Sequence, residues 1–538
     1  MSGRMLNVFI TLTAVTGFSL FGYNQGMMSG IIGGTQFTKS FETLDMPNNP
    51  TPAEDHHISV LRGAVVACYE IGCFFGAMFS MFFGERIGRT RLIFIGANVL
   101  TLGAVITTAA FGDHWGLGQF VVGRVVSGLG NGMNTATIPV WQSECSAAHN
   151  RGFLVCFEGA VIALGTFIAY WVVFGLSYVP TTVQWRFPIA LQCFFALFVA
   201  AGAVMFPDSP RWFVMRGRDE EACYVLGKLK NLPADSEEVL HDFNFMKADV
   251  ESSKHNQVNW KTIFSFGKTQ EFQRLMLGCS GQFFQQFTGC NAAIYYSTLL
   301  FEVNLGLDHR LSLIMGGVFA TVYAIATIPS FFMIERLGRR KLYLIGFLGQ
   351  GLSFVITFAC LIKPTEANSK GAIVGIFLFI TFFAFTILPL PWIYPPEINP
   401  GHTRTAGAAA STCTNWICNF AVVMFTPVFA SRSGWGVYLF FALVNLSAVP
   451  FGWFFYVETA GRELEEVDII YAKAYVEGKW PFIVAENLPK LTFEEIGEQS
   501  RELGIDAGDH SSTPEKTELG LSSDENGEFQ GVEAQEKQ

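Results

Sequence analysis

Long, mostly apolar stretches follow one another along almost the whole 538-residue chain. An α-helix needs about 20 such residues to cross the hydrocarbon core of a bilayer. Inside that core every backbone N–H and C=O needs an internal partner, and a helix supplies these partners within one stretch. We therefore predict an all-α integral membrane protein with twelve transmembrane helices, at residues 6–32, 60–83, 92–112, 118–141, 153–176, 186–206, 275–301, 311–333, 342–362, 371–394, 405–429 and 435–457.

Three charged motifs each occur twice, and every copy lies at the end of an apolar stretch. The second copies follow the first at nearly constant offsets (335 − 85 = 250, 397 − 144 = 253 and 458 − 208 = 250). Such repetition indicates two copies of one six-helix unit, which is typical of secondary transporters. The copies are residues 84–91 (GERIGRTR) and 334–341 (IERLGRRK), Glu144 with Arg151 and Glu397 with Arg404, and residues 207–211 (PDSPR) and 457–462 (VETAGR).

The amino-acid composition supports an integral membrane protein rather than a soluble protein or one that binds nucleic acid. Half of the residues are hydrophobic and 15% are charged, whereas soluble proteins have about 25% charged residues. The net charge of −10 does not indicate a nucleic-acid partner, because residues 497–538 alone hold eleven Asp and Glu against three Lys and Arg. The eleven cysteines show no metal-ligand spacing, and we predict no metal site and no cofactor.

Lys and Arg are concentrated in the loops after the second, fourth and eighth spans, which places these loops and both termini in the cytoplasm. Low hydrophobicity and high charge near the C-terminus favour disorder there. We predict four regions: an N-terminal six-helix half (1–206), a cytoplasmic linker domain (207–274), a C-terminal six-helix half (275–457), and an acidic cytoplasmic tail (458–538) that is largely disordered from about residue 497.

The seventh span contains the polar sequence QFFQQFTGCNAAIYY at residues 282–296. Carboxamides are costly to place in lipid, carry no charge, and both donate and accept hydrogen bonds, which suits a neutral polyhydroxyl ligand. The alternative is that they tie neighbouring helices together. Four carboxamides beside a glycine and a tyrosine pair favour a ligand site, and the prolines around Trp392 favour a hinge beside it. The candidate ligand residues are Gln282, Gln285, Gln286, Asn291, Tyr296, Trp392 and Asn415.

Three charged residues lie inside apolar spans. Arg124 in the fourth span needs a partner or a water-lined position, and Glu70 and Glu158 are the candidate carboxylates. Either carboxylate is a candidate for handling protons, although both also fit simple helix hydrogen bonding.

The duplicated charges predict a cytoplasmic gate, in which ion pairs hold the two halves together and break when that side opens. The alternative is that the arginines only satisfy the positive-inside preference. The gate candidates are Glu85, Arg86, Arg89, Glu144, Arg151, Glu335, Arg336, Arg339, Glu397, Arg404, Glu458 and Arg462.

Together these motifs resemble the sugar porter family of the major facilitator superfamily, over most of residues 15–470. The resemblance implies a twelve-helix transporter that exposes a central site to each side in turn. It also implies that Gln285, Gln286, Asn291, Trp392 and Asn415 contact the sugar. It rests on residues 21–23 (FGY), 84–89 (GERIGR), 207–212 (PDSPRW), 285–291 (QQFTGCN), 335–340 (ERLGRR), 415–416 (NW) and 458–466 (ETAGRELEE), and residues 69–76 and 169–171 are most similar to fungal members.

Two departures from the family pattern affect the expected mechanism. Proton-coupled members carry an Asp where this chain has Asn24, and that Asp is thought to pair with the arginine found here as Arg124. The family's Asn in the eighth span is replaced by Tyr323. An amide cannot release a proton, so the resemblance favours facilitated transport.

The sequence therefore predicts a plasma-membrane transporter of a small neutral monosaccharide, facilitative and without enzymatic activity. Open alternatives are a sugar:proton symporter, a polyol transporter, and a nutrient sensor that binds without net transport.

We expect Gln286→Ala to lower transport of the sugar without loss of folded protein, because it removes both hydrogen-bonding groups from the centre of the predicted site. Initial uptake rates, normalised to the folded fraction from gel filtration, test this. Unchanged uptake kinetics would contradict the site assignment.

Overall fold

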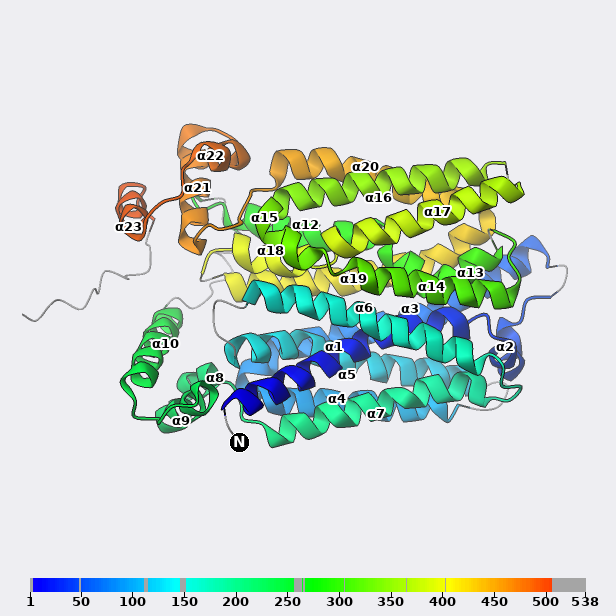
Figure 1. Cartoon of the computed structure of the whole chain (residues 1–538), viewed down its shortest axis with the longest axis horizontal. Helices are drawn as coiled ribbons and strands as arrows, with labels where there is room; N and C mark the ends of the chain where they lie inside the picture. Colours follow the sequence, from blue (N-terminus) through cyan, green and yellow to red (C-terminus); the bar gives the residue numbers. More distant parts are fainter. Residues whose placement is uncertain are drawn as a thin grey trace, which may run out of the picture.

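The structure is a computed structural model that describes residues 3–47, 50–110, 115–145, 151–255, 264, 267–303, 305–363, 365–401 and 403–505. The described chain is helical and contains no strand. Figure 1 shows a long bundle in which the N-terminal half (blue to cyan) lies below the C-terminal half (green to orange).

The N-terminal half is built from six helices that run alternately along the bundle. They are α1 (Gly3–Ile31), α3 (Pro52–Ile87), α4 (Arg89–Thr108), α5 (Trp115–Cys145), α6 (Arg151–Leu176) and α7 (Val183–Met205).

The C-terminal half repeats this arrangement, with three of its spans divided into shorter segments. These are α12 (Glu271–Phe287) with α13 (Cys290–Val303), α14 (His309–Ala326) with α15 (Ser330–Leu337), α16 (Arg339–Leu361), α17 (Glu366–Phe382) with the π-helix η3 (Phe383–Ile387) and α18 (Leu390–Ile398), α19 (Arg404–Arg432) and α20 (Gly436–Phe455).

Short helices cover the two ends of the bundle (Figure 1). We call one the linker end, since the linker helices and the tail helices lie there, and the other the α2 end. The backbone N–H of Gly3 donates to Asn231 Oδ1 (3.2 Å), which holds the start of α1 at the linker end. The short helices are α2 (Thr35–Ser40) and η1 (Glu42–Leu44) at the α2 end, and α8 (Pro210–Met215), α9 (Asp219–Lys230), α10 (Glu237–His255), α21 (Leu464–Glu477), α22 (Pro481–Asn487) and α23 (Phe493–Glu502) at the linker end.

The predicted all-α fold with twelve spans in two halves is confirmed. Ten helical runs in the described chain are long and apolar enough to cross a membrane. The other two predicted spans are α5, which contains Arg124, and the α12–α13 pair, which contains the carboxamides and is interrupted at Gly289 (φ 98°). Both of these spans hold candidate functional groups, and α12 and α13 are each shorter than 18 residues because the span is interrupted.

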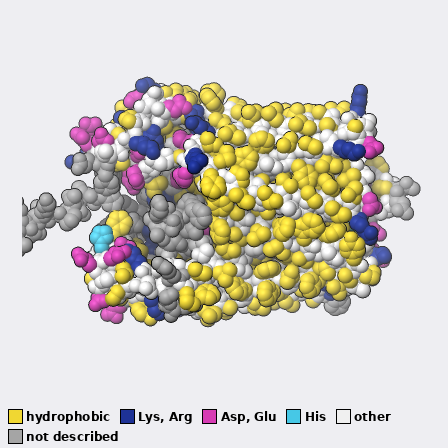
Figure 2. Space-filling view, in the orientation of Figure 1, with side chains coloured by type: hydrophobic (Ala, Val, Ile, Leu, Met, Phe, Trp, Pro, Cys, Tyr) yellow, Lys and Arg dark blue, Asp and Glu magenta, His cyan; other side chains and the backbone are white. Residues whose placement is uncertain are grey.

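Apolar side chains cover the face of the bundle that Figure 2 shows, and charged side chains gather at its two ends. Phe194, Phe332 and Val204 are among the large hydrophobic residues that are more than 60% exposed. Such a surface is stable in lipid and would aggregate in water.

The tail is ordered further than the sequence indicated. α23 continues as a helix to Glu502, past the predicted start of disorder at about residue 497. Residues 506–538, where the rest of the predicted disorder falls, lie outside the described part of the chain. Arg274 at the start of α12 pairs with Asp468 of α21 (2.6 Å), so the tail helices are attached to the C-terminal half.

Small residues allow α5 to approach its neighbours closely. A Cβ atom on Gly132 would lie 2.1 Å from the carbonyl oxygen of Cys73 in α3, and one on Gly128 would lie 2.1 Å from that of Tyr69. Close backbone contact at small residues is how helices pack in lipid, where no hydrophobic effect drives them together.

We expect Gly132→Ala to lower the free energy of unfolding by about 1–3 kcal/mol, because the added methyl group forces α3 and α5 apart. Thermal unfolding of the purified protein in detergent tests this. Gly118→Ala in the same helix is the matched control, since its Cβ would meet nothing within 4 Å. An equal effect of both substitutions would contradict the account.

Candidate functional site

A chain of carboxamides lies in the middle of the C-terminal half. Asn415 of α19 donates from Nδ2 to Gln282 Oε1 (2.6 Å) and Gln285 Oε1 (3.2 Å). Gln286 donates from Nε2 to Gln285 Oε1 (3.4 Å), and Asn291 of α13 donates from Nδ2 to Gln286 Oε1 (2.6 Å). All five side chains are at most 4% exposed. The structure thus brings five of the seven predicted ligand residues together.

The chain of carboxamides continues into the other half through Gln25 of α1, whose Nε2 donates to Asn291 Oδ1 (3.2 Å). The sequence analysis missed Gln25. The available signal was a second amide next to Asn24 in an otherwise apolar stretch. Because Gln25 and Asn291 belong to different halves, this contact joins the two repeats at the candidate site.

The other two predicted ligand residues are placed differently. Tyr296 is fully buried, and its hydroxyl donates to the carbonyl oxygen of Val423 in α19 (2.9 Å), so this hydroxyl takes part in helix packing. Trp392 is half-buried in α18, directly after Pro391. The carbonyl oxygen of Pro391 accepts a hydrogen bond from Gln282 Nε2 (3.0 Å).

Buried charges form a second cluster between the halves. Glu70 of α3 is fully buried, and its Oε1 accepts from the hydroxyl of Tyr295 in α13 (2.5 Å). Arg124 of α5 lies over the ring of Tyr69 (4.5 Å to the centroid) and donates to the carbonyl oxygen of Val66 (3.4 Å). Among the described residues, Glu70 Oε2 and Arg124 Nε and Nη1 have no hydrogen-bond partner.

The remaining coupling candidates do not form a charged pair with Arg124. Asn24 is fully buried and donates from Nδ2 to the carbonyl oxygen of Leu20 in its own helix (3.1 Å). Glu158 is half-buried in α6, and the described part of the chain offers no hydrogen bond or ion pair to its side chain.

Hydrogen bonds close the two halves against each other toward the α2 end. Ser29 of α1 donates to Thr298 of α13 (3.2 Å), Tyr170 of α6 contacts Ser297 (2.6 Å), and Trp171 donates to Thr321 of α14 (3.2 Å). These contacts lie between the level of Gln25 and the α2 end, where α1 and α6 approach α13 and α14. The structure is therefore closed at the α2 end.

The duplicated motifs form two equivalent charge clusters at the linker end. In the N-terminal half, Arg89 binds Glu144 through two hydrogen bonds (both 3.1 Å). Asp208 accepts from the backbone N–H of Arg89 (3.1 Å) and the hydroxyl of Thr90 (3.2 Å), at the N-terminus of α4. Burial raises the pKa of Asp208 above its ordinary value, although these hydrogen bonds lower it.

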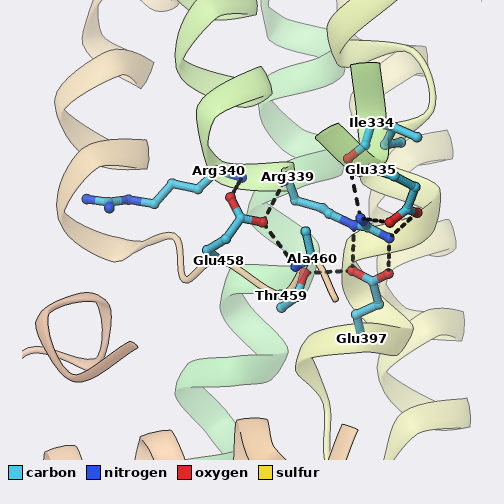
Figure 3. Close-up of polar contacts among 8 residues, drawn as sticks. All are labelled: Ile334, Glu335, Arg339, Arg340, Glu397, Glu458, Thr459 and Ala460. Atoms are coloured by element: carbon cyan, nitrogen blue, oxygen red, sulfur yellow. Dashed lines mark hydrogen bonds and ion pairs between the residues drawn. The ribbon is translucent and has the colours of Figure 1, made fainter. Parts of the chain in front are cut away.

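The C-terminal half repeats this geometry, as Figure 3 shows. Arg339 binds Glu397 (3.1 and 2.8 Å) and also Glu335 (3.0 and 3.0 Å). Glu458 accepts from the backbone N–H groups of Arg339 (2.7 Å) and Arg340 (3.1 Å). A carboxylate at a helix N-terminus both satisfies free N–H groups and offsets the helix dipole.

Glycine is required before each of these helices. Gly88 and Gly338 have φ of 103° and 85°, where residues with a side chain are strained. A Cβ atom would lie 2.5 Å from Asp208 Oδ2 in the first copy and 2.3 Å from Glu458 Oε2 in the second. The carboxylate can reach the helix end because no side chain stands in its way.

The prediction that these charges pair across the halves is wrong for this conformation. Arg89–Glu144 joins α4 to α5, and Arg339–Glu397 joins α16 to α18, so each cluster closes within its own half. The reason is that each bidentate guanidinium is already satisfied by a carboxylate of its own repeat. A gating role for the set remains a prediction.

The other gate candidates lie around these clusters. Glu85, Arg86 and Arg336 are exposed, and Arg404, at the start of α19, is half-buried. Arg462 pairs with Glu466 and donates to the carbonyl oxygens of Ala485 (2.6 Å) and Leu488 (2.9 Å), so it holds the tail helices. The side chain of Arg151, the first residue of α6, lies outside the described part.

Comparison with known proteins decides the family. The family described as "Sugar (and other) transporter" matches residues 9–471. The major facilitator superfamily transporter mfsA of Aspergillus fumigatus is 74% identical over 97% of this chain and 96% of that protein. The chain belongs to the sugar transporter family of the major facilitator superfamily. It is a membrane transporter and not an enzyme.

Two further relatives agree with this family. The sugar transporter STL1 of Saccharomyces cerevisiae is 54% identical over 94% of this chain and 88% of that protein. The solved structure of the proton:xylose symporter XylE bound to 6-bromo-6-deoxy-D-glucose has a TM-score of 0.72 at 23% identity, over 87% of this chain and all of that chain. The latter similarity shows the shared fold.

We expect Glu397→Ala to lower the free energy of unfolding by about 2 kcal/mol, less than for a fully buried pair because Glu335 still binds Arg339. Thermal unfolding in detergent measures this loss. Lys370→Ala is the control, since Lys370 and its partner Glu366 are 74% and 88% exposed and such a pair contributes at most about 0.5 kcal/mol. Equal losses would show that the cluster does not stabilise the bundle.

Proposed function

We propose that this protein carries a small neutral polyhydroxylated solute, in first place a monosaccharide, across the plasma membrane by alternating access. The observation that supports this most is the uncharged chain of carboxamides from Gln282 to Gln25, buried where the two halves meet. Carboxamides can exchange their mutual hydrogen bonds for bonds to hydroxyl groups without moving charge. The relative STL1 is named a sugar transporter, which favours a sugar over other neutral solutes.

The proposed orientation places the linker end in the cytoplasm, because the Arg-rich loops lie there. The closed α2 end then faces outward. Alternating access requires the hydrogen bonds of Ser29, Tyr170 and Trp171 to break when the outer side opens.

We propose facilitated transport because the side chain of Asn24 cannot exchange a proton and bonds to its own helix. A specific observation supports a second mode, proton symport. Glu70 is a fully buried carboxyl group that contacts Tyr295 of the other half, and one of its oxygens has no partner among the described residues. A carboxyl group that loses its partner as the halves move is suited to taking up and releasing a proton.

The decisive experiment is entry of radiolabelled glucose into proteoliposomes, with and without an inward proton gradient, followed by xylose and a polyol as competitors. We expect entry to stop at equal concentrations regardless of the gradient, because no charge moves with the solute. Accumulation above the outside concentration that depends on the gradient would establish symport. Binding without entry would favour the sensor alternative.

Glu70→Gln separates the two modes in the same assay. For a facilitator we expect exchange of internal for external sugar to have the same pH dependence as in the unsubstituted protein between about pH 5 and 8. For a symporter the substitution abolishes accumulation while exchange persists. The second result would contradict the proposed facilitated mode.

A further inference from the structure

The tenth span is rich in proline, and this leaves backbone carbonyl groups without their usual donors. In an α-helix the N–H of each residue donates to the carbonyl oxygen four residues earlier, and proline has no N–H. Pro391 therefore leaves the carbonyl oxygen of Ile387 without a helical donor, and Pro395 does the same to that of Pro391. Both lie inside the bundle, where an unsatisfied carbonyl group is costly.

Two glutamines of α12 supply the missing donors. Gln285 Nε2 donates to the carbonyl oxygens of Ile387 (3.2 Å) and Leu388 (3.1 Å), and Gln282 Nε2 donates to that of Pro391 (3.0 Å). The two glutamines are 3% and 1% exposed, so water does not compete for these bonds. The two glutamines are three residues apart, and the two freed carbonyl groups are four residues apart. Both separations are close to one helical turn, so each glutamine can reach one carbonyl group.

We propose that Gln282 and Gln285 are positioning residues, which replace the backbone hydrogen bonds lost at Pro395 and Pro391 and fix the kinked α18 to α12. Their Oε1 atoms are thereby held in place for Asn415. The amide donors that bond only to other side chains, and can therefore turn to a solute, are those of Gln286, Asn291, Asn415 and Gln25, and Gln285 can still accept from a solute through Oε1. This inference deepens the proposed function, since it divides the candidate site into residues that shape it and residues that bind.

The π-helix η3 supports this division. It ends at Ile387, and two of the three carbonyl groups that the glutamines satisfy lie at this irregular segment, in residues 387 and 388. Irregular backbone inside a membrane protein is tolerated where side chains satisfy the freed groups. The glutamines of α12 therefore hold the proline-containing backbone of α18, and α18 bends only together with α12.

A double-mutant cycle tests the unit. Gln282→Met removes the donor, and Pro395→Ala restores an N–H that reaches the carbonyl oxygen of Pro391. We expect Gln282→Met alone to lower the thermal midpoint in detergent by about 2–4 °C. In the Pro395→Ala background we expect it to lower the midpoint by about half as much, since the carbonyl group then has its backbone donor and only the bond that Gln282 Oε1 accepts from Asn415 is lost. Additive shifts would overturn the proposal.

Transport distinguishes positioning from general stability. We expect Gln282→Met to lower the maximal uptake rate about tenfold while KM changes less than about twofold, and Pro395→Ala to restore the rate in the double variant. A rise in KM that Pro395→Ala does not reverse would mean that Gln282 binds the solute directly, which also overturns the proposal.

Gln286→Met is the control, because Gln286 bonds only to side chains, and its thermal shift should add to that of Pro395→Ala. If Gln282→Met does not yield folded protein, Gln285→Met with Pro391→Ala gives the same cycle, with partial restoration because the carbonyl group of Leu388 also depends on Gln285.

The thermal cycle needs no solute. Non-additivity without uptake of any sugar would therefore refute the proposed function alone, and uptake with additive shifts would refute this inference alone.

Discussion

A polar group in the middle of a lipid bilayer needs a partner, and this requirement organises the structure. The carboxamides of α12, α13 and α19 satisfy one another, and Gln25 connects them to the other half. They form a neutral polar centre whose members are hydrogen-bonded to one another before any solute arrives. A solute with several hydroxyl groups can replace these bonds one for one, whereas an apolar or charged solute would leave groups unpaired.

At the linker end, charged groups hold the helices of each half together. Asp208 and Glu458 each hold the start of a helix, and Arg89 and Arg339 each bind a carboxylate of their own half. The two clusters therefore make each half a firm unit. Between the halves, the hydrogen bonds come from hydroxyl, amide and carboxyl groups. We expect the motion of alternating access to take place at this surface.

Much of this was predictable from the sequence, since membrane spans and duplicated motifs are local patterns. The twelve spans and their division into two halves followed from residue type and spacing alone. The hydrogen-bond partners of the polar residues could not be predicted, because they depend on how the helices pack. Nothing in the sequence placed Gln25 opposite Asn291, showed that Arg89 bonds within its own half, or matched Gln282 to the carbonyl group freed by Pro395. The polar groups of α5 and α12–α13 are satisfied by contacts far away in the chain.

The most direct test of alternating access between rigid halves is distance measurement by electron spin resonance. Nitroxide amino acids, encoded to avoid the eleven cysteines, would replace Val183 and Trp435 at the α2 end, and Met205 and Phe454 at the linker end, all exposed. We expect the Ser29→Ala, Tyr170→Phe variant to lengthen the distance between residues 183 and 435 and to shorten the distance between residues 205 and 454. The fraction of molecules that shows the longer distance should equal the fraction that shows the shorter one. Opening at the α2 end with no change at the linker end would contradict coupled motion of two rigid halves.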